Sequence, residues 1–207
     1  MLASRIAEKY RDKDCAVLAL NDGGVLVGVQ IAKQLQCVIM LLLSNEIKLP
    51  LEPDALAGIT SNGDFAYNTR YSTGEIDEFT NEYRGLIEQE KLSSMHDMNM
   101  LVSRGSVVNR KLLKGKNVIL VSDGFKSSFP LDLAVAYLKT IKIEKLIIAA
   151  PLASVQAVDR MHVTADEIYC LSVVEDFMDT DHYYDRNDTP DHDEIIDRLK
   201  EFILKWQ

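Results

Sequence analysis

The sequence predicts an α/β fold: a doubly wound, mostly parallel sheet with helices on both faces and an inserted segment at about residues 44–116. Short runs of Val, Ile and Leu alternate with helical stretches along the 207 residues. These runs lack polar–apolar alternation, as expected for strands covered on both faces. Their order implies right-handed crossovers within one sheet. The length suits a single domain over residues 1–207.

The expected elements begin with a short helix within residues 1–14, a charged stretch without the apolar centre of a signal peptide. Strands are then expected at residues 16–20, 37–43, 117–121, 145–150 and 167–173. Helices are expected at residues 24–35, 130–140 and 153–161. Pro151 should end the strand before it, and Ser154 can cap the following helix. A last helix over residues 194–207, capped by Asp191 or Asp193, carries the apolar stripe Ile195, Leu199, Ile203 and Trp206.

The inserted segment breaks the strand–helix rhythm. Residues 44–74 are rich in Gly, Pro, Asn and Ser, which indicates loop with short strands. A helix is expected at about residues 75–99. Its apolar residues recur at helical spacing, which favours an amphipathic packing helix; they are Ile76, Phe79, Tyr83, Leu86 and Ile87.

Composition excludes some classes of partner. The net charge of −9 disfavours nucleic acid and acidic membrane surfaces, which are held by Lys and Arg. No apolar run approaches the roughly 20 residues that span a bilayer. We therefore expect no nucleic-acid or membrane partner and a cytoplasmic location. The cysteines Cys15, Cys37 and Cys170 lie in or beside apolar runs and are interpreted as buried thiols of a reducing compartment.

Residues 115–138 contain the turn with the strongest functional signal. The strand at 117–121 runs into Ser122, Asp123 and Gly124, and Pro130 then begins a helix with Ser128 near its cap. A loop that leads into a helix N-terminus offers free backbone amides to a phosphate. An acid just before it can accept hydrogen bonds from sugar hydroxyls. A plain capped turn explains the same pattern equally well.

A second turn lies in residues 17–35, where a strand enters Asn21, Asp22, Gly23 and Gly24 and an apolar helix leaves. Two glycines allow close approach of a ligand. The carboxylate of Asp22 repels phosphate unless a divalent cation intervenes. A tight turn that needs glycine for its geometry is the structural alternative.

Together these segments resemble the type I phosphoribosyltransferases over nearly the whole chain. LALNDGGVLVGVQIAKQL is similar to their first β–α unit, whose turn reads like LALPRGG, and GKNVILVSDGF is similar to the lead-in of VILVDDGLATGAT. The resemblance implies binding of phosphoribosyl pyrophosphate (PRPP) with Mg²⁺ at the carboxyl ends of the strands. A base or other acceptor would then displace pyrophosphate. It also implies a small phosphoribosyl ligand, and the family is often homodimeric.

The resemblance also assigns roles to individual residues. Asp123 matches the catalytic acid that holds the ribose and contacts the metal. Phe177 matches an aromatic residue that stacks on the base. The substrate-binding positions of the two turns are Asn21, Asp22, Gly23, Ser122, Gly124, Phe125, Lys126, Ser127 and Ser128.

Several positions depart from the family pattern. Ser122 replaces the first acid, Ser128 replaces a loop glycine, and Pro130 replaces the final Thr. Asn21 and Asp22 replace Pro-Arg, which turns a cationic pyrophosphate site into an anionic one. Each departure lowers the expected affinity for a multiply charged phosphate, and Lys126 with Arg104 and Lys111 could compensate only in part.

Three functions remain open from the sequence. The first is a phosphoribosyltransferase of nucleotide metabolism with an unidentified base or other acceptor. The second is a catalytically inactive relative that binds a nucleoside or monophosphate, or acts through protein contacts. The third is metal-dependent hydrolysis by Asp179, Asp181 and His182 of the acidic stretch at 175–194, for which solvated surface is the structural alternative.

Overall fold

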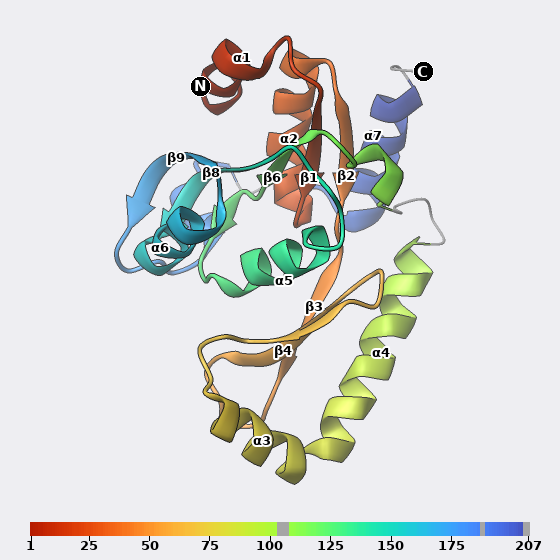
Figure 1. Cartoon of the computed structure of the whole chain (residues 1–207), viewed down its shortest axis with the longest axis vertical. Helices are drawn as coiled ribbons and strands as arrows, with labels where there is room; N and C mark the ends of the chain where they lie inside the picture. The colour runs from red at the N-terminus through yellow and green to blue at the C-terminus, as the bar shows by residue number, and fades with distance from the viewer. Residues whose placement is uncertain (103–107, 187–188, 205–207) are drawn as a thin grey trace.

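A parallel sheet forms the centre of the computed structural model, which describes residues 1–102, 108–186 and 189–204 (Figure 1). Its order is β2-β1-β6-β8, and both β7 and β9 pair with β8. All of its pairings are parallel. The strands are β1 (Cys15–Ala19), β2 (Val38–Leu41), β6 (Asn117–Val121), β7 (Gly124–Phe125), β8 (Lys145–Ser154) and β9 (Glu167–Val174). The predicted α/β class with a mostly parallel sheet is confirmed.

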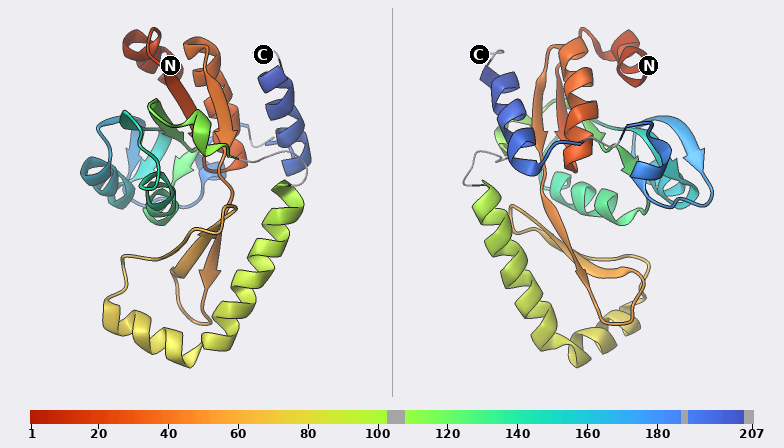
Figure 2. Two further views of the ribbon diagram at one scale, coloured as in Figure 1. Left: turned by 45° about the vertical axis from the view of Figure 1, so that its right-hand side comes forward. Right: turned by 180° about the vertical axis from the view of Figure 1, so that it is seen from behind.

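Helices cover both faces of this sheet (Figure 2). On one face lie α1 (Leu2–Tyr10), α2 (Asp22–Leu35) and α7 (His192–Leu204); on the other lie the 3₁₀ turn η1 (Arg110–Leu112), α5 (Phe129–Leu138) and α6 (Val155–Thr164). Successive strand residues face opposite sides of the sheet. Ile119 packs with the layer of α1, α2 and α7, and Leu120 packs with the layer of α5 and α6. Burial on both faces explains why the strands are uniformly apolar.

The inserted residues form a second, smaller sheet with two helices, which we call the insert (residues 44–102). Its strands β3 (Ser44–Lys48), β4 (Ala55–Thr60) and β5 (Phe65–Tyr67) are antiparallel. The single helix expected at 75–99 is in fact two, α3 (Thr73–Glu82) and α4 (Arg84–Val102), which meet at an angle (Figure 2). The five predicted apolar residues nevertheless share one cluster with β3 and β4.

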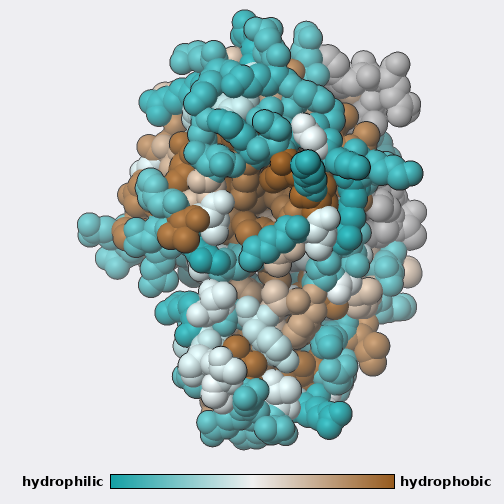
Figure 3. Space-filling model, in the orientation of Figure 1, coloured by the Kyte–Doolittle hydropathy of each residue, from teal (hydrophilic) through white to brown (hydrophobic). Residues whose placement is uncertain are grey.

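The insert packs against α5. Phe129 and Leu133 of α5 form a small buried cluster with Ala55 of β4. Gly58 lies so close to these two side chains that an added Cβ would be 2.5 Å from the Leu133 Cδ1 atom. In the face shown in Figure 3, apolar residues gather over the parallel sheet and hydrophilic residues frame them. The contacts of Ala55 with Phe129 and Leu133 hold the insert beside the N-terminal end of α5.

Several element boundaries differ from the prediction, among them the end of β8 and the start of α7. Pro151 does not end its strand, because β8 continues to Ser154. Beyond Ala149, which faces Val121 of β6, the strand gains β7 as its neighbour, so the missing amide of Pro151 falls where the partner changes. Ser154 does cap α6, since its side chain accepts from the Ala157 amide.

The last helix begins at His192 rather than at residue 194. The Asp191 side chain accepts a hydrogen bond from the Glu194 amide, as predicted for a cap. Ile195 and Leu199 of the predicted stripe are buried. The side chain of Ile203, and Trp206 and Arg104 altogether, lie outside what the structure describes.

Burial of the thiols raises the pKa of Cys15 to about 11 and that of Cys37 to about 12. Both groups therefore stay protonated at neutral pH, which argues against a catalytic thiolate. Cys37 and Cys170 are only half-buried, unlike Cys15. No helix among residues 1–102, 108–186 and 189–204 is long and apolar enough to cross a membrane.

Glu167 at the start of β9 ties α1 to the sheet. Its carboxylate accepts hydrogen bonds from the Lys9 ammonium at 2.7 Å and the Tyr10 hydroxyl at 2.7 Å, and Lys145 lies at 3.5 Å. Burial alone would raise the pKa of Glu167, but these partners outweigh it and lower the pKa from 4.5 to about 2.

We predict that acid weakens the protein through Glu167. A carboxyl whose pKa is lowered on folding stabilises the protein above its unfolded pKa, and this stabilisation is lost as the pH falls through the folded value. About 3 kcal/mol of the free energy of unfolding should disappear between pH 4.5 and pH 2. Urea titrations of the wild type and Glu167→Gln test this. The variant should be less stable at pH 7 and approach the wild type near pH 2; an equal gap at both pH values would contradict the prediction.

Candidate functional site

Two turns meet at the carboxyl edge of the sheet, because β1 and β6 are parallel neighbours. The Leu20 amide donates to the Val121 carbonyl, which aligns the ends of the two strands. The Asn21 side-chain amide then donates to Asp123 Oδ1 at 2.6 Å. The structure therefore brings together the predicted residues of both turns, which lie about a hundred positions apart in the chain.

Asn21 is also the N-cap residue of α2. Its Oδ1 accepts a hydrogen bond from the Gly24 amide at 2.8 Å, as expected of an N-cap asparagine. An added Cβ at Gly24 would lie 2.9 Å from the Val121 carbonyl oxygen, and one at Gly23 would overlap the Asp123 carboxylate. The two glycines are thus required where one turn touches the other.

Ser122 is 3% exposed and its hydroxyl serves the turn itself. It donates to the Gly124 carbonyl at 2.8 Å, and the Gly124 amide approaches it at 3.2 Å. Ser122 therefore stabilises the turn where the family pattern has an acid. Asp123 is left as the acidic side chain of the central motif.

The loop after Asp123 is shorter than expected. Gly124 and Phe125 form β7 beside β8, and the Phe125 side chain is 2% exposed in the core. Only the backbone of Phe125 is left to border a ligand. Phe129 is buried against the insert, so its bulk does not fill the loop. The candidate loop is thus residues 126–128.

Within this loop Lys126 is exposed, and Ser127 and Ser128 are half-buried. Ser128 occupies the N-cap position of α5, but its side chain makes no capping hydrogen bond. The structure records no acceptor for the Ser127 and Ser128 amides among its described residues. Free amides and hydroxyls at a helix N-terminus form a natural cradle for an anion.

The acidic stretch after β9 covers the turn from the other side. A Cβ added at Gly124 would lie 3.1 Å from Cζ of the Phe177 ring and 3.2 Å from the Thr180 hydroxyl oxygen. The Tyr184 hydroxyl donates to the Asp123 carbonyl at 2.8 Å. Burial raises the pKa of Tyr184 to about 12, so it remains a donor. Phe177, the predicted stacking residue, thus lies at the site, in contact with the Tyr183 ring.

His192 is a site residue that sequence reasoning missed. Its Nδ1 atom lies 2.9 Å and 3.1 Å from the two carboxylate oxygens of Asp22. His192 begins α7, whereas Asp22 begins α2, so only the tertiary fold brings them together. No motif in the sequence signals this pair.

The described residues offer no ready-made metal centre. No group of three or more His, Cys, Asp or Glu side chains within them is arranged to hold an ion. Asp179 instead caps the 3₁₀ turn η2 (Thr180–Tyr183) by accepting from the His182 amide at 3.0 Å. Hydrolysis by a metal on the acidic stretch therefore has no geometric support in the described chain.

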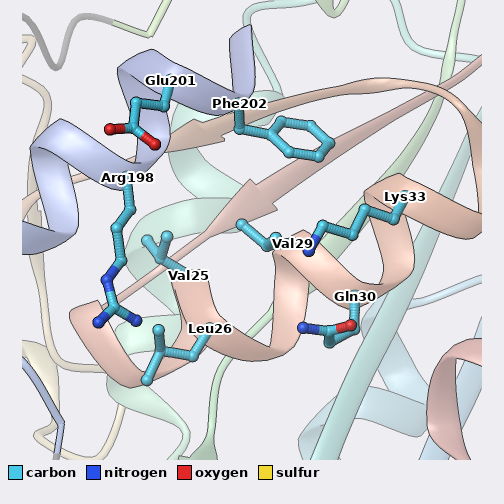
Figure 4. Close-up of a pocket in the computed structure, with 8 residues that line it drawn as sticks. All are labelled: Val25, Leu26, Val29, Gln30, Lys33, Arg198, Glu201 and Phe202. Atoms are coloured by element: carbon cyan, nitrogen blue, oxygen red, sulfur yellow. The ribbon is translucent and has the colours of Figure 1, made fainter. Parts of the chain in front are cut away.

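A groove of about 480 Å³ lies elsewhere, between α2 and α7 (Figure 4). Its wall combines aliphatic and charged side chains, with Val25 and Val29 on α2 facing Phe202 on α7. None of the predicted site residues lines it. The carboxyl edge of the sheet therefore remains the candidate site.

The chain is similar to known proteins in sequence and in fold. No model of a known protein family matches the chain. Two curated Mycobacterium tuberculosis proteins, from strains CDC 1551 / Oshkosh and H37Rv, are each 25% identical to it over 178 residues, which is 83% of this chain. Both bear the name "Putative phosphoribosyl transferase". The chain is phosphoribosyltransferase-like. It spans only 38% of the length of these relatives.

A solved structure supports the fold. The crystal structure of TT1426 from Thermus thermophilus superposes with a TM-score of 0.72 at 23% identity, covering 97% of this chain and 93% of that one. The match includes the insert as well as the parallel sheet, because it spans almost the entire chain. The two proteins thus share one α/β fold over almost their whole lengths.

Proposed function

We propose that this phosphoribosyltransferase-like chain binds a 5′-phosphorylated ribose ligand at the carboxyl edge of its sheet. Asp123 would accept hydrogen bonds from the ribose hydroxyls, and residues 126–128 would hold the phosphate. The observation that carries this proposal is the free loop at the N-terminus of α5. The Ser128 side chain makes no capping hydrogen bond, and the Ser127 and Ser128 amides have no recorded acceptor among the described residues. Lys126 adds an exposed positive charge.

Asp123 has capacity for such a ligand. Its Oδ1 accepts from Asn21, whereas Oδ2 has no hydrogen-bond partner from the described residues. A carboxylate has about four acceptor positions, so Asp123 can keep Asn21 and still bind a sugar hydroxyl. Asn21 would hold the carboxylate in place before a ligand arrives.

Transfer from PRPP is the second candidate function, favoured by the sequence likeness to relatives that bear the transferase name. Mg²⁺ commonly binds through one or two carboxylates together with substrate phosphates. Asp123 is the residue that would contribute to such an ion. The ion would neutralise charge on departing pyrophosphate, while the acceptor would be chosen by residues beside Phe177.

Calorimetric titration with ribose 5-phosphate and AMP tests the proposed site. Asp123→Asn keeps the size of the side chain but removes its charge, and should weaken binding about tenfold or more, because a hydrogen bond to a charged group contributes about 1.5–3 kcal/mol. Asp77→Asn is the matched control, since Asp77 is exposed on α3 in the insert. Absence of binding heat for every phosphorylated ribose would refute the proposal.

The same proteins separate binding from transfer. Release of pyrophosphate from PRPP and Mg²⁺ would be measured across a panel of bases. Turnover that Asp123→Asn abolishes and Asp77→Asn leaves unchanged would favour the transferase. Binding of AMP without any turnover would favour a ligand-binding protein of the same fold.

A further inference from the structure

The site contains two helix N-termini that differ in charge. The N-cap residue of α5 is Ser128, whose side chain makes no capping hydrogen bond. Helix α2 begins with Asp22, and the Asn21 side chain already caps its Gly24 amide. The positive partial charge of a helix N-terminus attracts an anion. A carboxylate in the first turn of the helix already offsets this charge. The N-terminus of α5 therefore attracts a ligand phosphate more strongly than the N-terminus of α2 does.

His192 holds the Asp22 carboxylate in place at the start of α2. A carboxylate only accepts hydrogen bonds, so the His192 Nδ1 atom carries the hydrogen that points to Asp22. The Nε2 atom is buried without a partner among the described residues. The ring is thus fixed on Asp22 from one side, with side chains of His192 and Asp22 21% and 32% exposed.

A second carboxylate deepens the negative field at this end. Asp123 reaches α2 through Asn21 and lies against Gly23. The ion pairs of the described residues place no Lys or Arg on Asp22 or Asp123. A ligand phosphate approaching the first turn of α2 would therefore meet two carboxylates and one imidazole. The exposed Lys126 belongs to the other turn.

We propose that Asp22, held in place by His192, makes the site selective for ribose ligands with a single phosphate, on the α5 side. This inference rests on the proposed function and names its ligand class. The ligand would be a ribose 5-phosphate or nucleoside monophosphate, with no anionic group facing the start of α2. A sugar that carries a diphosphate on that side is disfavoured by charge.

Paired titrations test this selectivity. Ribose 5-phosphate and PRPP, each without Mg²⁺, would be titrated into the wild type, Asp22→Asn, His192→Ala and the charge-matched control Asp77→Asn. The wild type should bind ribose 5-phosphate about tenfold or more tightly than PRPP, since like charges a few ångströms apart at a protein surface cost about that factor. Asp22→Asn should tighten the binding of PRPP about tenfold relative to that of ribose 5-phosphate.

The histidine variant separates selectivity from structure. His192→Ala leaves Asp22 without its donor and should weaken the binding of PRPP further relative to that of ribose 5-phosphate. A purely structural role would weaken both ligands equally and would overturn the inference. An unchanged ratio in Asp22→Asn, with ribose 5-phosphate still bound, would overturn the inference alone. Failure of ribose 5-phosphate to bind any of the four proteins would remove the proposed function as well.

Discussion

Replacing Gly24 with valine is expected to destabilise the protein by about 3 kcal/mol and to abolish ligand binding. The new Cβ would lie 2.6 Å from Asn21 Oδ1, 2.9 Å from the Val121 carbonyl oxygen and 3.1 Å from the Ser122 Cα. Two of these neighbours are backbone atoms of the central strand and its turn, so they cannot rotate away. Relief requires α2 to move from the sheet, which separates Asn21 from Asp123.

Gly74→Val is the matched control for this substitution. Gly74 lies in the first turn of α3, and nothing lies within 4 Å of an added Cβ there. The free energy of unfolding of Gly74→Val should differ from that of the wild type by less than about 0.5 kcal/mol, because Val and Gly have similar helix propensities. Denaturant unfolding monitored by circular dichroism measures both variants. Equal stability of Gly24→Val and the wild type would show that α2 does not need this close contact.

The layout of the main sheet could be predicted because its strands are long, apolar and covered on both faces. The run at 117–121 matches β6 residue for residue, and the carboxyl-edge location of the two turns follows from their strands being parallel neighbours. Strand β7 was missed because a two-residue strand carries no periodicity. Its pairing with β8 depends on tertiary contact, as does the placement of Phe125 in the core.

The break between α3 and α4 was missed for a related reason. Apolar spacing continues through Tyr83, which caps α3 and still packs with Ile87 in one cluster. Periodicity reports which face is buried and says little about where a helix bends. The pair of Asp22 and His192 was missed because the partners are 170 residues apart and neither belongs to a motif. Site details that depend on such distant contacts require the fold.

The expected loss from Arg160→Ala is also about 3 kcal/mol, because it leaves a buried carboxylate without its charged partner. Asp132 in the first turn of α5 is 7% exposed. Its Oδ1 accepts from Arg160 Nε of α6 at 2.5 Å, and its Oδ2 is 3.3 Å from the Thr69 hydroxyl of the insert. One carboxylate therefore connects α5, α6 and the insert, in the helical turn that follows the loop at 126–128.

Arg198→Ala is the matched control, since its partner Glu194 lies one turn away on α7 and both side chains are about half exposed. Such surface pairs contribute roughly 0.3–0.5 kcal/mol. The double variant Arg160→Ala/Asp132→Ala should recover part of the loss, because no unpaired carboxylate remains. Equal unfolding free energies for the two arginine variants would contradict this account. A lower affinity of Arg160→Ala for ribose 5-phosphate would show that the buried pair also holds the start of α5 in place.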